Sequence, residues 1–334
     1  MNWALIGASR IASQYMIDAL RAQPGGAVDW VISGSADHAA DFAARHSIAN
    51  SSTRMADALA DPGVDAVYIS STNEKHHAQA MAAIAAGKHV LCEKPLAMTV
   101  ADARAMVVAA QTAGVVFATN HHLRCSGSHQ TLRDLIRAGH IGRVLSVRIF
   151  HAVHLPQSLQ GWRIDSAAAG GGVVADITVH DADVVRFLLD EDPQSVVAQV
   201  ASSGMGQGVE DSAMSVWAMP SGAMVFSHES FTHPFAGSGL EVHGTTGSLF
   251  ARGVMTQNPV GAIELVTAQG STAVPYPDHG LYRFGVAQFC AAVAGVGSPA
   301  ASGLDGVKSL AVAAAVRAAA ASGARVTVNY EASA

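Results

Sequence analysis

The sequence predicts a two-domain protein: an α/β domain with a doubly wound parallel sheet, then an α+β domain with an open, largely antiparallel sheet. Two observations lead to this expectation. Short apolar runs alternate with helical patterns over residues 1–120, which is typical of βαβ units and a parallel sheet. From Ser195 to Pro277, strand follows strand with glycine and proline turns between them, which indicates an antiparallel sheet with one covered face.

Each strand expected in the first domain ends in small or polar residues, as the ligand-binding edge of a doubly wound sheet requires. The expected strands are Trp3–Ile6, Val28–Ser33, Ala66–Ser70, His89–Cys92 and Val115–Thr119. The expected helices lie near Ser9–Ala22, Ala36–His46, Arg54–Ala60, His76–Ala86 and Val100–Ala113.

The second domain is expected to begin after Asn120, so that the domains span residues 1–120 and 121–334. Turn signals at 220–222, Gly244 and Gly270 separate its later strands. The last two helices can pack back on the first domain. The expected elements here are helix Ser128–Ala138, strand Val144–His154, helix Val173–Leu189, and the closing helices Tyr282–Val296 and Leu304–Ser322.

Composition narrows the class of protein. Half of the 334 residues are hydrophobic and 14% are charged, so a large core is available. The net charge is −6 and the 20 Lys and Arg form no long block, which argues against nucleic-acid and membrane-surface partners. Three scattered cysteines and an N-terminus without a signal peptide suggest a soluble cytoplasmic protein. Monomer and homo-oligomer both stay open.

A degenerate dinucleotide fingerprint follows the first strand. Gly7, Ser9 and Ala12 occupy its three small positions, with Arg10 and Ile11 between them. Gly7 permits the tight turn, Ser9 lets backbone amides approach a pyrophosphate, and Ala12 allows close packing of helix on sheet. This placement at the first βα junction predicts a Rossmann domain that binds a nicotinamide cofactor.

The end of the second strand bears on which cofactor is bound. An Asp or Glu there would hold the ribose 2′-hydroxyl of NAD, but this chain has Ser33-Gly34-Ser35. Arg10 and His38 can supply positive charge near a 2′-phosphate. The pattern therefore favours NADP, although Ser33 as a plain strand-end residue would leave both cofactors possible.

Polar residues also follow the third and fifth strands. They are expected to converge on the cofactor, because the carboxyl ends of parallel strands meet at one edge. A metal site is not expected, since none of the 16 histidines belongs to an HExxH motif or a Cys/His pair at ligand spacing. The residues concerned are Ser71, Thr72, Asn73, His76 and His77 after the third strand, and Asn120, His121 and His122 after the fifth.

Glu93-Lys94-Pro95 ends the fourth expected strand and is the most informative triplet of the chain. A lysine at the carboxyl end of a parallel strand lies where open α/β sheets bind ligands. The proline cannot continue the hydrogen-bond ladder, so the strand must stop there. The ammonium group of Lys94 is suited to stabilising charge on a substrate oxygen.

A second signal is the run Gly170-Gly171-Gly172 before the helix that carries Asp176 and His180. On a helix, these two side chains lie on one face because they are four residues apart. A carboxylate beside an imidazole offers a proton donor with a neighbour that orients it. Glycines before the helix let the backbone pass close to a ligand.

Together these motifs resemble the glucose–fructose oxidoreductase and inositol dehydrogenase family over nearly the whole chain. The resemblance implies a Rossmann domain, a second domain with an open antiparallel sheet, and oxidation or reduction of a sugar or polyol with a nicotinamide cofactor. The longest matching runs indicate members that reduce the C2 ketone of 1,5-anhydro-D-fructose with NADPH. The runs are 90–98, 119–124, 159–163 and 176–183.

Carried over residue by residue, the resemblance makes His180 the proton donor to the substrate oxygen and Lys94 its catalytic neighbour. Asp176 would hold a substrate hydroxyl or orient His180. One departure concerns His38, where the resemblance leads us to expect arginine. The residues implied to line the cofactor are Gly7, Ser9, Arg10, Ile11, Ala12, Ser33, Gly34, His38, Ser71, Thr72, Asn73, His76, Glu93, Lys94, Asn120, Trp162, Arg163 and Tyr282.

Two other functions stay open. One is an inositol or sugar dehydrogenase of the same family that works in the oxidative direction. The other is a non-catalytic NADP-binding sensor, although retention of Lys94, Asp176 and His180 speaks against a protein that needs no proton relay.

Overall fold

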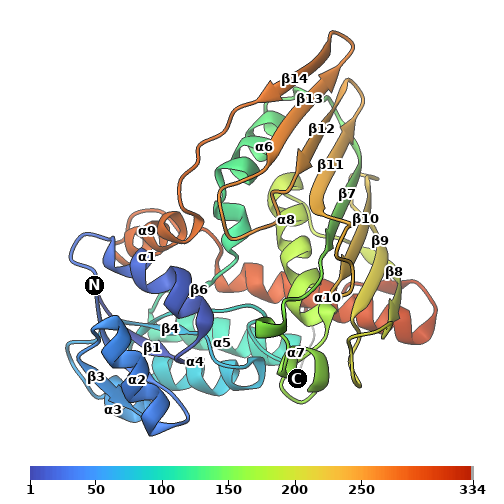
Figure 1. Cartoon of the computed structure of the whole chain (residues 1–334). Helices are drawn as coiled ribbons and strands as arrows, with labels where there is room; N and C mark the ends of the chain where they lie inside the picture. The colour runs from blue at the N-terminus through green and yellow to red at the C-terminus, as the bar shows by residue number, and fades with distance from the viewer. Residues whose placement is uncertain (332–334) are drawn as a thin grey trace. The chain divides into compact units, whose positions relative to one another are not determined.

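The computed structural model describes residues 1–331 (Figure 1). They divide into two compact units, which we describe one at a time. Unit 1 contains residues 1–121 and 282–307, and unit 2 contains residues 122–281 and the described residues from 308 on. No helix among residues 1–331 is long and apolar enough to cross a membrane.

Unit 1 is built on a six-stranded sheet with the order β3-β2-β1-β4-β5-β6, in which all neighbours pair in parallel. This is the doubly wound order of the Rossmann fold, and it confirms the predicted fold class. The strands are β1 (Asn2–Ile6), β2 (Ala27–Ile32), β3 (Asn50–Ser52), β4 (Ala66–Ile69), β5 (His89–Cys92) and β6 (Phe117–Thr119). The helices are η1 (Ala12–Met16), α1 (Ile17–Arg21), α2 (Ala36–His46), α3 (Met55–Leu59), η2 (Asn73–Lys75), α4 (His76–Ala85) and α5 (Val100–Ala113), with α9 (Leu281–Val293) joining from residue 282.

Local sequence explains where these elements begin and end. β4 is buried along its whole length, as a strand covered on both faces must be. Ser35 and Thr99 cap α2 and α5 by accepting hydrogen bonds from the backbone N–H of His38 and Asp102. Gly114 ends α5 in the left-handed conformation that glycine adopts without strain.

A late segment of the chain completes the core of unit 1. Phe289 on α9 packs against Trp3 on β1, with ring centroids 5.2 Å apart. Tyr282 stacks on Tyr15 at 4.9 Å. Such aromatic pairs stabilise a core beyond the area that they bury, so α9 is a structural part of the Rossmann unit.

Unit 2 contains a nine-stranded sheet with the order β14-β13-β12-β11-β7-β10-β9-β8-β15. Its strands are β7 (Val144–Ala152), β8 (Ser195–Ala201), β9 (Ser212–Ala218), β10 (Met224–Ser230), β11 (Ser238–Gly244), β12 (Gly247–Arg252), β13 (Ala262–Thr267), β14 (Gly270–Val274) and β15 (Val326–Thr327). Its helices are η3 (His122–Cys125), α6 (Gly127–Arg137), η4 (Gln157–Leu159), α7 (Trp162–Asp165), η5 (Val174–Thr178) and α8 (Val179–Leu189), and α10 (Gly303–Ser322) enters this unit at residue 308.

The sheet of unit 2 is mixed, because β7 lies between β10 and β11 and pairs in parallel with β10. The other strand pairs are antiparallel, which confirms a largely antiparallel sheet. A simple meander over 195–277 would have paired β10 with β11. The earlier strand β7 takes the place between them, so residues 231–237 bridge across it.

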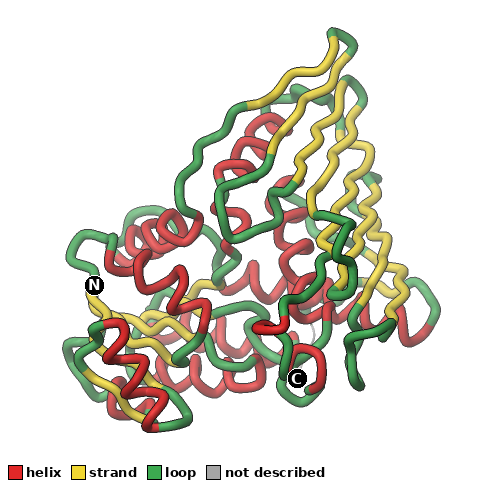
Figure 2. Tube along the Cα trace, in the orientation of Figure 1, coloured by secondary structure: helices red, strands yellow, loops and turns green. Residues whose placement is uncertain are grey.

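One face of this sheet is covered by helices, including α6 and α8, and the other face is open (Figures 1 and 2). Ile149, Trp217 and Val225 are buried on the covered face. Met224 and Phe226, which alternate with Val225 along β10, are exposed. This alternation is what a half-covered sheet requires.

Two helices differ from their predicted form. The expected helix 9–22 contains the π-helical segment η1, and the expected helix 173–189 begins with the π-helical segment η5. π-Helical turns are uncommon and are frequent at functional sites. Both lie directly after the glycine-containing segments that the sequence marked as sites.

Candidate active site

The turn after β1 requires glycine. Gly7 has φ +118°, and a Cβ atom there would lie 2.9 Å from the carbonyl carbon of Ser70 and from the nitrogen of Ser71. The backbones after β1 and β4 therefore approach as closely as they can. Any side chain at residue 7 would push these strand ends apart.

Ser9 fixes the start of the first helix. Its Oγ accepts a hydrogen bond from the N–H of Ala12 at 3.1 Å and lies 2.7 Å from Oγ of Ser70. Arg10, on the same turn, donates from Nε to Gln14 at 3.1 Å. A tight glycine turn before a helix N-terminus fits the pyrophosphate of a dinucleotide, because helix N-termini attract anions.

Small and polar groups gather after β2. Oγ of Ser33 lies 3.1 Å from Nδ1 of His38, so these two predicted residues are in direct contact. Apart from Gly34 itself and its two chain neighbours, no heavy atom lies within 4 Å of the position that a Cβ on Gly34 would take. The loop Ser33-Gly34-Ser35 therefore offers hydroxyl and imidazole groups and open space for a cofactor ribose.

His76 has a positioning role in this structure. It is fully buried, with Nδ1 2.8 Å from the carbonyl oxygen of Pro95 and Nε2 3.2 Å from that of Ser71. Burial lowers the pKa of its imidazole, so the ring is neutral and donates one N–H. It lies between the ends of β4 and β5 and can donate to only one of these two carbonyl oxygens, and its contact with a cofactor stays a prediction.

Glu93 is held from two neighbouring strands. Oε1 of Glu93 accepts hydrogen bonds from the hydroxyl of Tyr68 and from Nδ2 of Asn120, both at 2.6 Å. Burial, and then the Glu93 carboxylate, raise the pKa of Tyr68 well above its usual range, so Tyr68 remains a neutral donor. Lys94 follows directly and joins Pro95 through a cis peptide bond.

In unit 2, glycines of the run 170–172 lie close to atoms of other residues. A Cβ on Gly171 would lie 2.5 Å from the carbonyl oxygen of Trp162, and one on Gly172 would lie 2.6 Å from Oε1 of Glu210. The N–H of Gly172 also donates to the carbonyl of Arg163 at 2.8 Å. Within unit 2, these glycines are therefore explained by the docking of α7 and Glu210.

This docking brings predicted residues together. Nε of Arg163 lies 3.5 Å from Oδ1 of Asp176, and the Arg163 guanidinium stacks over the Trp162 ring at 4.6 Å. A guanidinium held by both a carboxylate and an indole has a defined orientation. Trp162, Arg163 and Asp176 thus form one group.

His180 lies in the first turn of α8 and is 7% exposed. Its ring meets the ring of His122 edge to face, with centroids 5.0 Å apart. This pairing links α8 to the η3 turn at the start of unit 2. An imidazole that is nearly buried but reachable has the setting expected of a proton donor.

The predicted site residues thus form groups within each unit. Unit 1 brings together the turns after β1, β2, β4, β5 and β6, and unit 2 brings together Trp162, Arg163 and Asp176, with His180 beside His122. Tyr68 and Ser70, which anchor Glu93 and Ser9, were not predicted as site residues. Their positions at the end of β4, opposite other strand ends, are the signal that would have found them.

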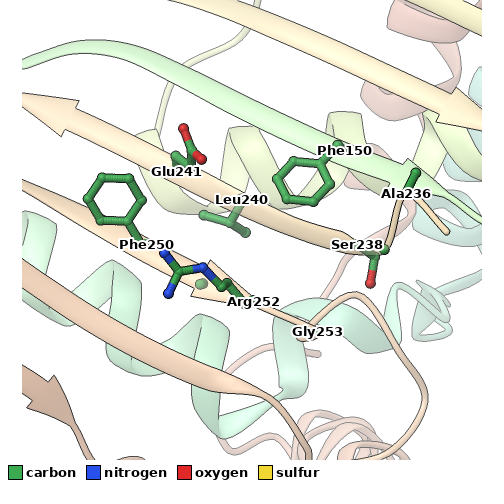
Figure 3. A pocket seen from close by; sticks show the side chains of 10 residues that line it. Phe150, Ala236, Ser238, Leu240, Glu241, Phe250, Arg252 and Gly253 are labelled. Atoms are coloured by element: carbon green, nitrogen blue, oxygen red, sulfur yellow. The ribbon is translucent and has the colours of Figure 1, made fainter.

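A cavity of about 330 Å³ lies elsewhere in unit 2, at the β7, β11 and β12 strands (Figure 3). Phe150, Leu240 and Phe250 line it together with Glu241 and Arg252. None of the site residues predicted from the sequence lines this cavity. We therefore assign no step of the chemistry to it.

The fold and strand-end chemistry of unit 1 define the class: an oxidoreductase with a nicotinamide-binding Rossmann domain. Residues 1–121 match the model of the oxidoreductase family with the NAD-binding Rossmann fold, and residues 129–250 match the GFO/IDH/MocA C-terminal domain. The chain belongs to the GFO/IDH/MocA family. The predicted family is confirmed.

Several relatives in the family are named for activities on sugars or polyols. The chain is 53% identical to 1,5-anhydro-D-fructose reductase of Ensifer adhaerens over 96% of this chain and 97% of that protein. It is 31% identical to inositol 2-dehydrogenase of Rhizobium meliloti (strain 1021) over 79% of this chain and 81% of that protein. Levoglucosan dehydrogenase in complex with NADH and levoglucosan has a similar structure, with a TM-score of 0.89, 25% identity, and coverage of 98% of this chain and 99% of that chain.

Proposed function

We propose that this protein is an NADPH-dependent reductase that converts the C2 ketone of 1,5-anhydro-D-fructose to the alcohol of 1,5-anhydro-D-mannitol. The observation that carries the proposal is the 53% identity, over 96% of the chain, to a 1,5-anhydro-D-fructose reductase. The contacts of the predicted residues in both units agree with this chemistry.

Bound NADPH would supply the hydride for the ketone carbon. Gly7, Ser9 and Arg10 would hold the pyrophosphate at the turn after β1. The pair Ser33 and His38 would meet the 2′-phosphate, because the loop that carries Ser33 has no carboxylate to repel it. The preference for NADPH rests on this pair together with Arg10.

His180 would protonate the oxygen of the ketone as negative charge develops there. Lys94 would stabilise the same oxygen electrostatically, since an ammonium group lowers the energy of an alkoxide. Glu93 is fixed by Tyr68 and Asn120 and would orient the residue that follows it. Asp176, beside Arg163, would hold a substrate hydroxyl or orient His180.

A second candidate is oxidation of an inositol or a related polyol. It is favoured by the 31% identity to inositol 2-dehydrogenase over 79% of this chain. The same residues would then work in reverse, with His180 accepting a proton from the alcohol.

The decisive assay follows NADPH oxidation with 1,5-anhydro-D-fructose, an inosose and a glucose-derived ketone, and identifies the products. The proposal expects turnover of 1,5-anhydro-D-fructose with the highest kcat/KM of the three. Faster oxidation of myo-inositol with NADP or NAD than reduction of 1,5-anhydro-D-fructose would favour the second candidate. Intact NADPH binding without turnover of any compound would favour a sensor.

A further inference from the structure

Two buried carboxyl groups lie next to His180, the residue proposed as the proton donor. Asp181, next to His180 on α8, and Glu229 on β10 are both 0% exposed. No lysine or arginine in residues 1–331 pairs with either carboxyl group, which is unusual, because buried charges are nearly always paired.

The hydrogen bonds around the pair lack one proton. The Ser227 hydroxyl donates to Oε1 of Glu229. With both groups written as carboxylates, Oε2 of Glu229 and both oxygens of Asp181 have no donor in the part of the chain that the structure describes. Both carboxyl groups nevertheless lie beside the same side chain, because His151 is 3.6 Å from Asp181 and pairs with Glu229 in the strand register. A hydrogen bond between the two carboxyl groups can form only if one of them carries a proton.

His151 on β7 is the basic side chain beside the pair. The distance of 3.6 Å from its Nδ1 to Oδ1 of Asp181 allows an ion pair if the imidazole is protonated, but it is longer than a hydrogen bond. His129 on α6 is fully buried, and burial is the main cause that lowers its pKa to about 4. Burial raises the pKa of Asp181 and of Glu229 well above their usual range.

We propose that Asp181 and Glu229 share one proton at neutral pH, and that this bond is a positioning device that fixes α8, and with it His180, against β10. Consecutive side chains on an α-helix point about 100° apart, so a tether at residue 181 sets the direction of residue 180. The functional part of this proposal rests on the proposed role of His180. The shared proton itself does not.

The sign of the pH effect follows from the raised pKa values. Below the ordinary carboxyl pKa, both groups are protonated in the folded and unfolded chain. As pH rises toward the folded-state pKa, the unfolded chain releases protons that the folded chain retains, so the stability of the fold falls. Above the folded-state pKa, two buried carboxylates repel each other and the tether is lost.

Asp181→Asn tests the pair, because an amide keeps a donor for Glu229 but does not titrate. We expect kcat at pH 7 close to wild type, an unfolding midpoint that exceeds wild type increasingly as pH rises, and a weaker alkaline decline in kcat.

Asp181→Ala removes the tether, and we expect kcat to fall by about 10- to 100-fold, since a misplacement of about 1 Å can cost 10²-fold. NADPH affinity should stay unchanged. Asp190→Asn, at the exposed end of α8, is the matched control.

Infrared spectroscopy of the full-length protein detects the proton directly and needs no turnover. We expect a carboxylic-acid band at pH 7 in the wild type that is lost in the double variant Asp181→Asn/Glu229→Gln. Three results together would overturn the shared proton in favour of a His151–Asp181 ion pair. They are absence of that band in the wild type, lower stability of the Asp181→Asn variant, and a lower pKa of His151 in that variant than in the wild type. An unchanged kcat in a folded Asp181→Ala variant would overturn the positioning role. Failure of the proposed reductase activity would leave the infrared and unfolding results untouched.

Discussion

Asn120 donates a hydrogen bond of 2.6 Å to Glu93, which joins the carboxyl ends of the neighbouring strands β6 and β5. Tyr68 at β4 donates to the same oxygen. Three adjacent strands thus fix the residue that precedes Lys94. A charged group that must act at a defined position benefits from a rigid support of this kind.

The first prediction concerns Lys94 and His180. Lys94→Ala should lower kcat by about 10² or more, because a positioned proton relay contributes about 10²–10⁴ in rate. His180→Ala should do the same. Steady-state kinetics would measure kcat, and a separate fluorescence titration would measure NADPH binding. NADPH binding should persist in both variants.

Near-wild-type turnover of the Lys94 variant would remove Lys94 from the mechanism. A His180 variant that changes only KM would make His180 a binding residue. Lys88→Ala, a lysine of the same unit that donates to the carbonyls of Asp61 and Val64, is a control that should leave kcat unchanged.

The second prediction concerns Ser33. Ser33→Asp should move the preference from NADPH toward NADH, because a carboxylate repels a 2′-phosphate and accepts from a 2′-hydroxyl. We expect the ratio of kcat/KM values to change by at least about tenfold, which corresponds to about 1.4 kcal/mol. An unchanged ratio would mean that the 2′-position lies elsewhere.

The third prediction concerns His38, which contacts Ser33. An imidazole loses its charge as pH rises from about 6 to 8, whereas arginine stays charged and grips phosphate with two N–H groups. His38→Arg should therefore bind NADPH more tightly than wild type, with a difference that widens at high pH. Phosphate becomes more anionic over the same range, so the two proteins must be compared at each pH.

NADH serves as the control for His38→Arg, because it lacks the 2′-phosphate. Its affinity should not differ between the two proteins. An equal gain for both cofactors, or for neither, would show that His38 points away from the cofactor and that Arg10 and Ser33 set the preference.

The fourth prediction concerns stability. Burial tends to raise the pKa of Asp211, but hydrogen bonds from the backbone N–H of Gly206, Ser203 and Met205 outweigh burial and hold the pKa well below its usual range. The stability that Asp211 contributes is therefore present above the ordinary carboxyl pKa and is lost as pH falls.

Asp211→Asn should lower the free energy of unfolding by about 1–3 kcal/mol at pH 7, because an amide cannot accept all of these bonds. The difference from wild type should shrink in acid. Denaturant unfolding at several pH values measures it, with the exposed Asp41→Asn as control. A difference that grows as pH falls would contradict the assignment.

The sequence predicted the Rossmann unit well, because hydrophobic periodicity and strand-end residues are local signals. β5 was predicted residue for residue, and α2 and α5 agree with their capping residues. The short edge strand β3 was missed, since Asn50–Ser52 is polar and partly exposed. The turn of the dinucleotide fingerprint was predicted because its backbone conformation requires glycine at residue 7.

What the sequence could not show depends on contacts between distant residues. The position of β7 beside β10 is set by tertiary pairing and not by local pattern. The glycines 170–172 were predicted to approach a ligand, whereas in unit 2 Gly171 and Gly172 accommodate α7 and Glu210. The acidic pair Asp181 and Glu229 cannot be recognised in the sequence, because its members are 48 positions apart.

The most direct test of the proposed reaction uses NADPH that carries deuterium at C4 of the nicotinamide. With 1,5-anhydro-D-fructose as the substrate, the product should be 1,5-anhydro-D-mannitol with one deuterium at C2, identified by NMR and mass spectrometry. The His180→Ala variant should form the same labelled product more slowly. Absence of labelled product, while the protein still binds NADPH, would contradict the account.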